Sequence, residues 1–131
     1  MLAGPFFQSD PIGLTLAADQ RFGLLDPYID AVWQANLSPT KPLALETSLC
    51  LQAKILSLFP VFLINRRPIW LINDFFSQPR VDEIFSNYAR FTCTPAAGFQ
   101  ARLEVWAQTS TTLVCRLSLH NLTESKAMLG I

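Results

Sequence analysis

The chain has 131 residues, which is enough for one domain with a substantial core. Its 10 basic and 10 acidic residues balance and form no run of either sign, which argues against nucleic acid and anionic membrane surfaces as partners. Half of the residues are hydrophobic and only 15% are charged, so we expect more apolar side chains than a small domain buries. The excess has three expected locations: a large two-sided core, a partner surface or a ligand cavity.

The first residues contain no secretion signal of the usual kind. Residues 1–13 hold two glycines and two prolines, so we expect an irregular segment without a basic region or a continuous apolar region. The longest apolar cluster, residues 55–64, is interrupted by Ser57 and Pro60 and is too short to span a bilayer. We therefore expect a cytoplasmic protein without a membrane span.

The first third of the chain predicts short strands. Residues 13–25 fit a hairpin that turns at Asp19 and Gln20 and returns over residues 22–25. Residues 28–35 fit either a helix or a strand, and the neighbouring strands favour a strand. Two prolines within residues 36–42 then indicate a turn.

The middle of the chain predicts two longer elements around a hairpin. Residues 43–58 alternate as one long strand, with a bulge or bend expected near its end. Residues 61–72 indicate a hairpin that turns at residues 65–68, followed by a loop over residues 73–79. Residues 81–93 alternate as a second long strand with aromatic rings on both sides, for which we expect cover on each face.

The clearest pattern lies between Phe99 and Leu122, after a turn at residues 94–98. It predicts two antiparallel strands that share one buried face and are joined by a polar connection at residues 108–112. A polar break and a short apolar tail follow over residues 123–131. The side chains predicted on the shared face are Leu103, Val105, Ala107, Leu113, Cys115, Leu117 and Leu119.

These elements predict an all-β fold with eight or nine strands in largely sequential antiparallel order. The expected architecture is a single antiparallel β-sandwich domain over residues 1–131 or a closed meander.

Two segments, residues 44–60 (ALETSLCLQAKILSLFP) and residues 79–125, resemble the amino-terminal β-sandwich, or supersandwich, of bacterial glycoside hydrolases with an α/α toroid catalytic domain. The most similar parts are residues 99–107, which run to a Trp, and residues 117–123, which end in Asn-x-Thr. The resemblance covers residues 24–125 and implies a noncatalytic domain that packs on a catalytic toroid, walls its cleft and joins dimer contacts. It also implies an incomplete sandwich or a fragment, and it transfers no catalytic residue to this chain.

No catalytic constellation, cofactor or metal site is predicted. His120 is the single histidine and falls on the polar side of its strand. The acidic residues form no recognisable catalytic pair, and Asp82 and Glu83 are expected on opposite sides of a strand. The three cysteines lack zinc-site spacing and are expected as free, buried side chains at Cys50, Cys93 and Cys115, with a disulfide as the alternative.

Carbohydrate binding is the one recognition chemistry that these residues support, because an exposed aromatic ring stacks on a sugar and nearby polar groups bind its hydroxyls. Trp106 is the best candidate, since it falls on the polar side of its strand; the alternative is that it packs under a second layer or another domain. Trp33 is assigned to the core. The weaker candidates are Trp70, Tyr88 and Arg90.

Three hypotheses for function follow. The preferred one is a noncatalytic β-sandwich domain of a carbohydrate-active protein, which packs on a catalytic partner or contributes to carbohydrate binding. The second is a structural module that forms a homo-oligomer through an apolar surface. The third is a small β-barrel that encloses an apolar ligand. The residues expected on the oligomer surface are Phe6, Phe7, Phe75, Phe76 and Leu129.

Overall fold

The computed structural model describes residues 13–17, 32–47, 56–109 and 112–130. These residues form strands and one 3₁₀ turn, η1, at Ile72–Asp74, which confirms the all-β prediction. The strands are β1 Gly13–Ala17, β2 Val32–Asn36, β3 Ala44–Thr47, β4 Leu56–Leu58, β5 Phe62–Ile64, β6 Arg67–Ile69, β7 Ser77–Phe85, β8 Tyr88–Ala96, β9 Phe99–Thr109, β10 Thr112–Asn121 and β11 Leu129–Gly130.

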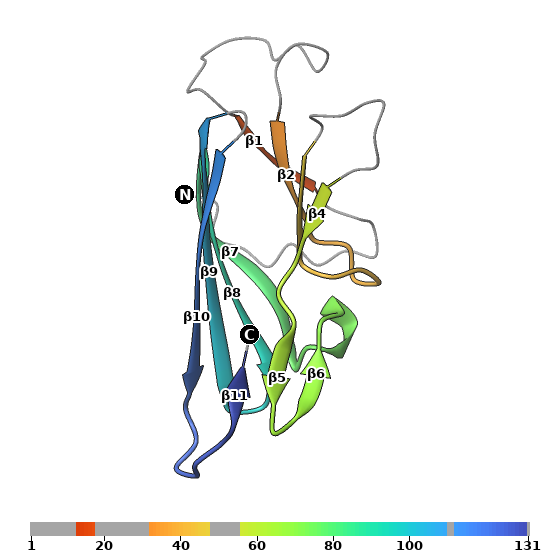
Figure 1. Ribbon diagram of the computed structural model, residues 1–131, viewed down its shortest axis with the longest axis vertical. Helices are drawn as coiled ribbons and strands as arrows, with labels where there is room; N and C mark the ends of the chain where they lie inside the picture. Colours follow the sequence, from red (N-terminus) through yellow and green to blue (C-terminus); the bar gives the residue numbers. More distant parts are fainter. Residues whose placement is uncertain (1–12, 18–31, 48–55, 110–111, 131) are drawn as a thin grey trace.

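The strands form three antiparallel sheets arranged in two layers (Figure 1). One layer is the four-stranded sheet β10-β9-β8-β7. The other layer contains the sheets β1-β2-β3-β4 and β11-β5-β6. All three sheets have free edges among the described strands, so the predicted sandwich is confirmed and neither the closed meander nor the small barrel forms in this part of the chain.

One hydrophobic core lies between the layers and takes side chains from all three sheets. Trp33 is 4% exposed, which confirms its assignment to the core. Phe75 packs edge-to-face on Phe62 with ring centroids 5.8 Å apart, so its predicted place on a partner surface is wrong. The largest fully buried side chains of the core include Leu16, Phe62, Ile72, Val81, Phe91 and Val105.

The predicted strand pair between Phe99 and Leu122 is confirmed. β9 and β10 pair antiparallel, and the core-side residues of β10 lie opposite the buried residues of β9. Cys115 nevertheless is exposed, because β10 is the edge strand of its sheet, so the prediction of three buried cysteines is wrong at this position. Cys93 is buried as predicted, and Cys50 lies outside the described residues.

Both predicted long strands are wrong as single strands. Residues 81–93 contain a turn at Ser86 and Asn87, which separates β7 from β8, because these residue types favour turns. β3 and β4 pair antiparallel, so the chain reverses direction between Thr47 and Leu56 where one continuous strand was expected. The connecting residues 48–55 lie outside the described part.

The other predicted elements have mixed outcomes. β1 pairs with β2, while the predicted return strand at residues 22–25 and the irregular residues 1–12 lie outside the described chain. β2 confirms a strand for the described part of residues 28–35. Within residues 73–79, the expected loop is shorter, because η1 ends at Asp74 and β7 begins at Ser77.

The hairpin predicted within residues 61–72 is confirmed, since β5 pairs with β6. Its turn is shorter than expected: Asn65 and Arg66 form it with φ angles of 51° and 68°, while Arg67 and Pro68 belong to β6. The turn also anchors the apolar tail, because the Asn65 amide donates to the Met128 carbonyl at 2.9 Å and β11 pairs with β5.

Among the described residues, no helix has the length and apolar character required to cross a membrane.

Gly98 is required in the turn between β8 and β9. Its φ is 81°, and a Cβ at this position would collide with the side-chain methyl of Thr123. Its carbonyl accepts a hydrogen bond from the Leu122 amide at 2.8 Å, which holds the segment after β10 against the turn.

We predict that Gly98→Ala destabilises the fold by about 2 kcal/mol, because a non-glycine residue in the left-handed region is strained and the new methyl collides with Thr123. Urea unfolding measures the change. Thr123→Ser removes the methyl and keeps the hydroxyl that donates to Asn121, so it should restore part of the loss in the double variant and change little alone. Equal stability of wild type and Gly98→Ala would contradict the prediction.

Candidate functional site

The side of the β7–β10 sheet that faces away from the core is organised in rows across the strands, because residues opposite each other in an antiparallel pair point to the same face. We call this side the outer face. Its first row is apolar and mostly aromatic. The row consists of Phe85, Tyr88, Trp106 and Val114, which are successive register partners on β7, β8, β9 and β10.

The three rings of this aromatic row lie next to one another. The ring centroids of Phe85 and Tyr88 are 5.9 Å apart, and those of Tyr88 and Trp106 are 6.3 Å apart. Phe85 is 60% exposed, while Tyr88 and Trp106 are half-buried. The row therefore presents connected apolar surface outside the core.

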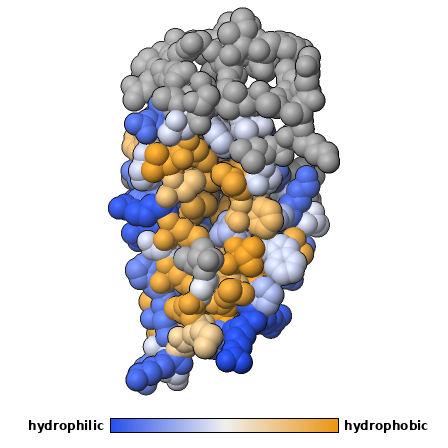
Figure 2. All heavy atoms as spheres, in the orientation of Figure 1, coloured by the Kyte–Doolittle hydropathy of each residue, from blue (hydrophilic) through white to orange (hydrophobic). Residues whose placement is uncertain are grey.

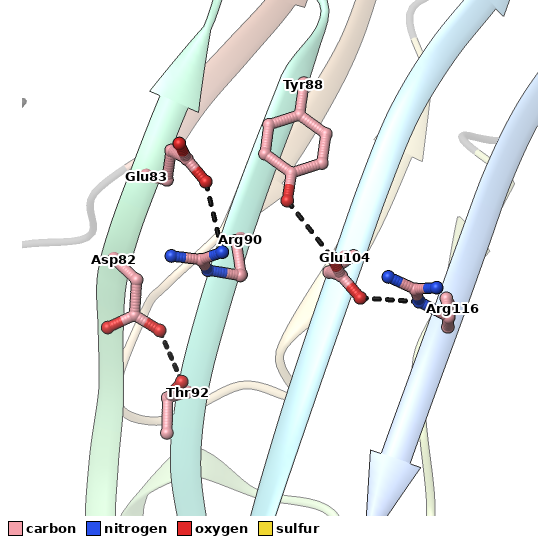
Figure 3. Close-up of polar contacts among 7 residues, drawn as sticks. All are labelled: Asp82, Glu83, Tyr88, Arg90, Thr92, Glu104 and Arg116. Atoms are coloured by element: carbon pink, nitrogen blue, oxygen red, sulfur yellow. Dashed lines mark hydrogen bonds and ion pairs between the residues drawn. The ribbon is translucent and has the colours of Figure 1, made fainter.

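The next row alternates in charge across the four strands (Figure 3). A guanidinium nitrogen of Arg90 lies 3.2 Å from Glu83 Oε2, and Arg116 Nε donates to Glu104 Oε2 at 2.6 Å. The Tyr88 hydroxyl donates to Glu104 Oε1 at 3.2 Å and thus joins the aromatic row to this charged row. The charged row is Glu83, Arg90, Glu104 and Arg116.

A β-bulge adds a third carboxylate to the outer face. The register shifts between Val81 and Glu83, so Asp82 is an extra residue in β7. Asp82 accepts hydrogen bonds from the Thr92 hydroxyl and from Arg80 Nε, the latter at 2.8 Å. Asp82 and Glu83 consequently bond to residues on the same face, and the prediction that they point to opposite sides is wrong (Figure 3).

Glu104 is the centre of the polar network on this face. The hydrogen bond from Arg116 lowers the pKa of Glu104, and its burial acts against this effect. Burial and the neighbouring carboxylate of Glu104 raise the pKa of Tyr88. Glu104 therefore stays ionised as an acceptor, and Tyr88 stays protonated as a donor.

The structure brings together three of the four sequence-predicted binding residues. Trp106 and Tyr88 are register partners in the aromatic row, and Arg90 lies in the adjacent charged row. Trp70 follows β6 in the other layer and does not join them, although it is 40% exposed. The sequence did not identify Phe85 as a site residue, because this residue was placed within a continuous strand. It also did not identify Glu104 and Arg116, because their positions depend on how β8, β9 and β10 pair. The signal that could have placed Phe85 is the Ser-Asn pair that follows it.

No group of His, Cys, Asp and Glu side chains in the described part of the chain could hold a metal ion. Comparisons with family models, curated proteins and solved structures find no match to this chain. The resemblance to the glycoside hydrolase supersandwich thus stays a prediction, and function has to be argued from the outer face itself.

The lowered pKa of Glu104 predicts a pH-dependent contribution to stability. Because the folded state favours the ionised carboxylate, the stabilisation is present above the ordinary pKa of glutamate and is lost as the pH falls through the lowered folded value. Glu104→Gln should therefore be less stable than wild type at neutral pH, and the difference should shrink on acidification. Urea unfolding over a pH series measures it. The exposed Glu124 provides the control Glu124→Gln, and a pH-independent difference for Glu104→Gln would contradict this account.

Proposed function

We propose that this chain is a noncatalytic β-sandwich domain of a carbohydrate-active protein and that the outer face of the β7–β10 sheet binds sugar. The observation that supports the proposal is the aromatic row beside the charged row. The rings of Tyr88 and Trp106 offer apolar faces to sugar rings, and the side chains of the next row offer donors and acceptors for sugar hydroxyls.

A neutral sugar fits this face better than a charged one. The charged row contains two acidic and two basic residues, and they form ion pairs with each other. A ligand with a net charge would be attracted by the side chains of one sign and repelled by those of the other sign on the next strand. Sugar hydroxyls both donate and accept hydrogen bonds, so they can use both kinds of side chain.

The carboxylates of the outer face support a binding role over hydrolysis. Glycoside hydrolysis needs a carboxylic acid with a raised pKa as proton donor and a second free carboxylate. The pKa of Glu104 is lowered, Glu83 pairs with Arg90, and Asp82 accepts hydrogen bonds from Arg80 and Thr92. The domain would hold a glycan while a catalytic partner performs the reaction, which agrees with the role that the supersandwich resemblance implies.

Trp106→Ala tests the proposal. We expect it to weaken the binding of cello- or malto-oligosaccharides at least tenfold, roughly 1.4 kcal/mol, because stacking on the central ring pair is lost. Isothermal titration calorimetry measures the affinity. Phe85→Ala removes a largely exposed ring of the same row and should also weaken binding with little effect on folding.

Trp70→Ala is the matched control, since Trp70 is an exposed tryptophan in the other layer. It should bind sugar as wild type does, and circular dichroism checks that each variant is folded. Equal loss of affinity in Trp70→Ala and Trp106→Ala would refute the assignment to the outer face, and the absence of sugar binding in wild type would refute the function.

A second candidate function is self-association, and the edge strand β10 favours it. Among the described strands, β10 pairs only with β9, and its core-side residues Leu113, Leu117 and Leu119 are only half-buried. Apolar side chains also gather on the side of the molecule where this sheet lies next to the strands β4, β5 and β11 (Figures 1 and 2). A long edge strand without proline offers free backbone groups to another strand.

A second copy of β10 is a suitable partner for this edge. If two β10 strands pair antiparallel about Leu117, Cys115 lies opposite Leu119 of the second copy on the core side. Arg116 then lies opposite Ser118 of the second copy on the outer face, so like charges do not meet. This register continues both the apolar and the polar pattern of the strand.

Leu117→Lys should abolish such a dimer, because a charge at the centre of the core-side contact opposes its burial. Sedimentation velocity over a concentration series gives the oligomeric state. Gln108→Lys adds the same charge at an exposed position on β9 and should remain dimeric. A wild-type chain that stays monomeric over the whole series would end this second candidate.

A further inference from the structure

A cavity of about 310 Å³ lies at the other end of the outer face from the aromatic row. A second register shift in β7 lies at its wall. Ser77 and Arg80 are paired with β8, and the two residues between them, Gln78 and Pro79, face the single residue Cys93 on β8. Proline suits this position because it needs no ladder hydrogen bond. The residues that line the cavity are Ser77, Gln78, Arg80, Thr92, Cys93, Thr94 and Gln100.

The lining suits a ligand rich in hydroxyl groups. No hydrogen bond joins the side chains of Ser77, Gln78, Thr94 or Gln100 to another described residue, so their donors and acceptors face solvent or a ligand. Arg80 uses Nε to bond Asp82, which leaves its terminal nitrogens without a side-chain partner in the described chain. Because Asp82 balances the charge of Arg80, the cavity favours a neutral polar ligand over an anion.

The cavity and the aromatic row belong to one continuous face. Tyr88 and Thr94 both lie on β8 with their side chains on the outer face, and their separation of six residues corresponds to about 20 Å. Between them lie Arg90, Thr92 and, on β9, the exposed Arg102, which pairs with Thr92. A single sugar or a disaccharide does not span this distance, whereas a longer oligosaccharide does.

We propose that the cavity is a second sugar subsite, so that the outer face takes an extended neutral oligosaccharide along β8 and β9, with one part on the aromatic row and the other in the cavity. This inference rests on the proposed function and adds the length of the ligand and the position of its second contact. The carboxamides of Gln78 and Gln100 are the principal contacts in the cavity, since each offers a donor and an acceptor.

The test compares ligands of increasing length. Cello- and malto-oligosaccharides from the disaccharide to the hexasaccharide are titrated into wild type, Gln100→Ala and the double variant Gln78→Ala/Gln100→Ala. For wild type we expect an increase in affinity of at least tenfold between the disaccharide and the hexasaccharide. The double variant should lose most of this gain and bind the disaccharide as wild type does, which also shows that it is folded. Gln108→Ala changes an exposed amide outside the cavity and should behave as wild type.

The outcomes separate the two proposals. If wild type binds all lengths equally, or if the double variant keeps the full gain, the second subsite is refuted and binding at the aromatic row stands. If Phe85→Ala weakens every length equally while the double variant affects only the longer ligands, the subsite is supported. If no sugar binds to wild type, the proposed function itself fails.

Discussion

The register of β8 against its two neighbours is the constraint on which the outer face depends. Ala89, Phe91 and Cys93 of β8 are buried. Their register partners on β9 are Val105, Leu103 and Ala101, which are buried as well. A slip of one residue would turn all of these side chains out of the core, so the buried face strongly fixes the pairing. The same pairing also fixes the register of the outer face. Once the core side is in register, the aromatic and charged rows must form.

The high apolar content of the chain is only partly used by the core. Leu58, Leu63 and Met128 are exposed, and the half-buried leucines of β10 pack against the core while staying partly accessible, so part of the apolar content remains on the surface. The cavity on the outer face is lined by amides, hydroxyls and a guanidinium group together with Cys93, and it does not take up the apolar excess. The accessible apolar side chains are the basis of the proposed self-association, and the outer face is the basis of the proposed sugar binding.

The sequence was informative where one face is buried and the other is polar. β9 and β10 alternate without interruption, so their pairing and shared face could be predicted, and the polar side of β9 correctly identified Trp106 as lying outside the core. The β7–β8 hairpin could not be found in the same way. A two-residue turn inverts the phase of the alternation, so that Ile84 and Ala89 face inward while Phe85 and Tyr88 face outward. Since Ile84 and Phe85 are both apolar, hydrophobicity did not reveal the inversion.

The bulges were hidden for a related reason. Each bulge inserts one residue into β7. No residue type near Asp82 indicates a bulge, so the sequence alone does not predict that Asp82 and Glu83 share a face. Their common face follows from the pairing of β7 with β8. The second shift is marked by Pro79, but a proline alone indicates a strand start or an edge equally well. The sequence contained the residues of the site, whereas their arrangement depends on contacts between strands.

For the proposed sugar binding, the hydrogen bond between Tyr88 and Glu104 would make the aromatic row a better surface than three freely moving rings. It fixes the hydroxyl end of Tyr88, and Arg116 in turn holds the carboxylate of Glu104. A ring that is already ordered loses less conformational freedom when a ligand stacks on it, so more of the contact energy appears as affinity.

Arg116 also shows that the two candidate functions are compatible. Its side chain acts on the outer face, whereas strand pairing at β10 would use the backbone edge and bury the core-side residues, so a dimer would leave the aromatic rows of both copies accessible.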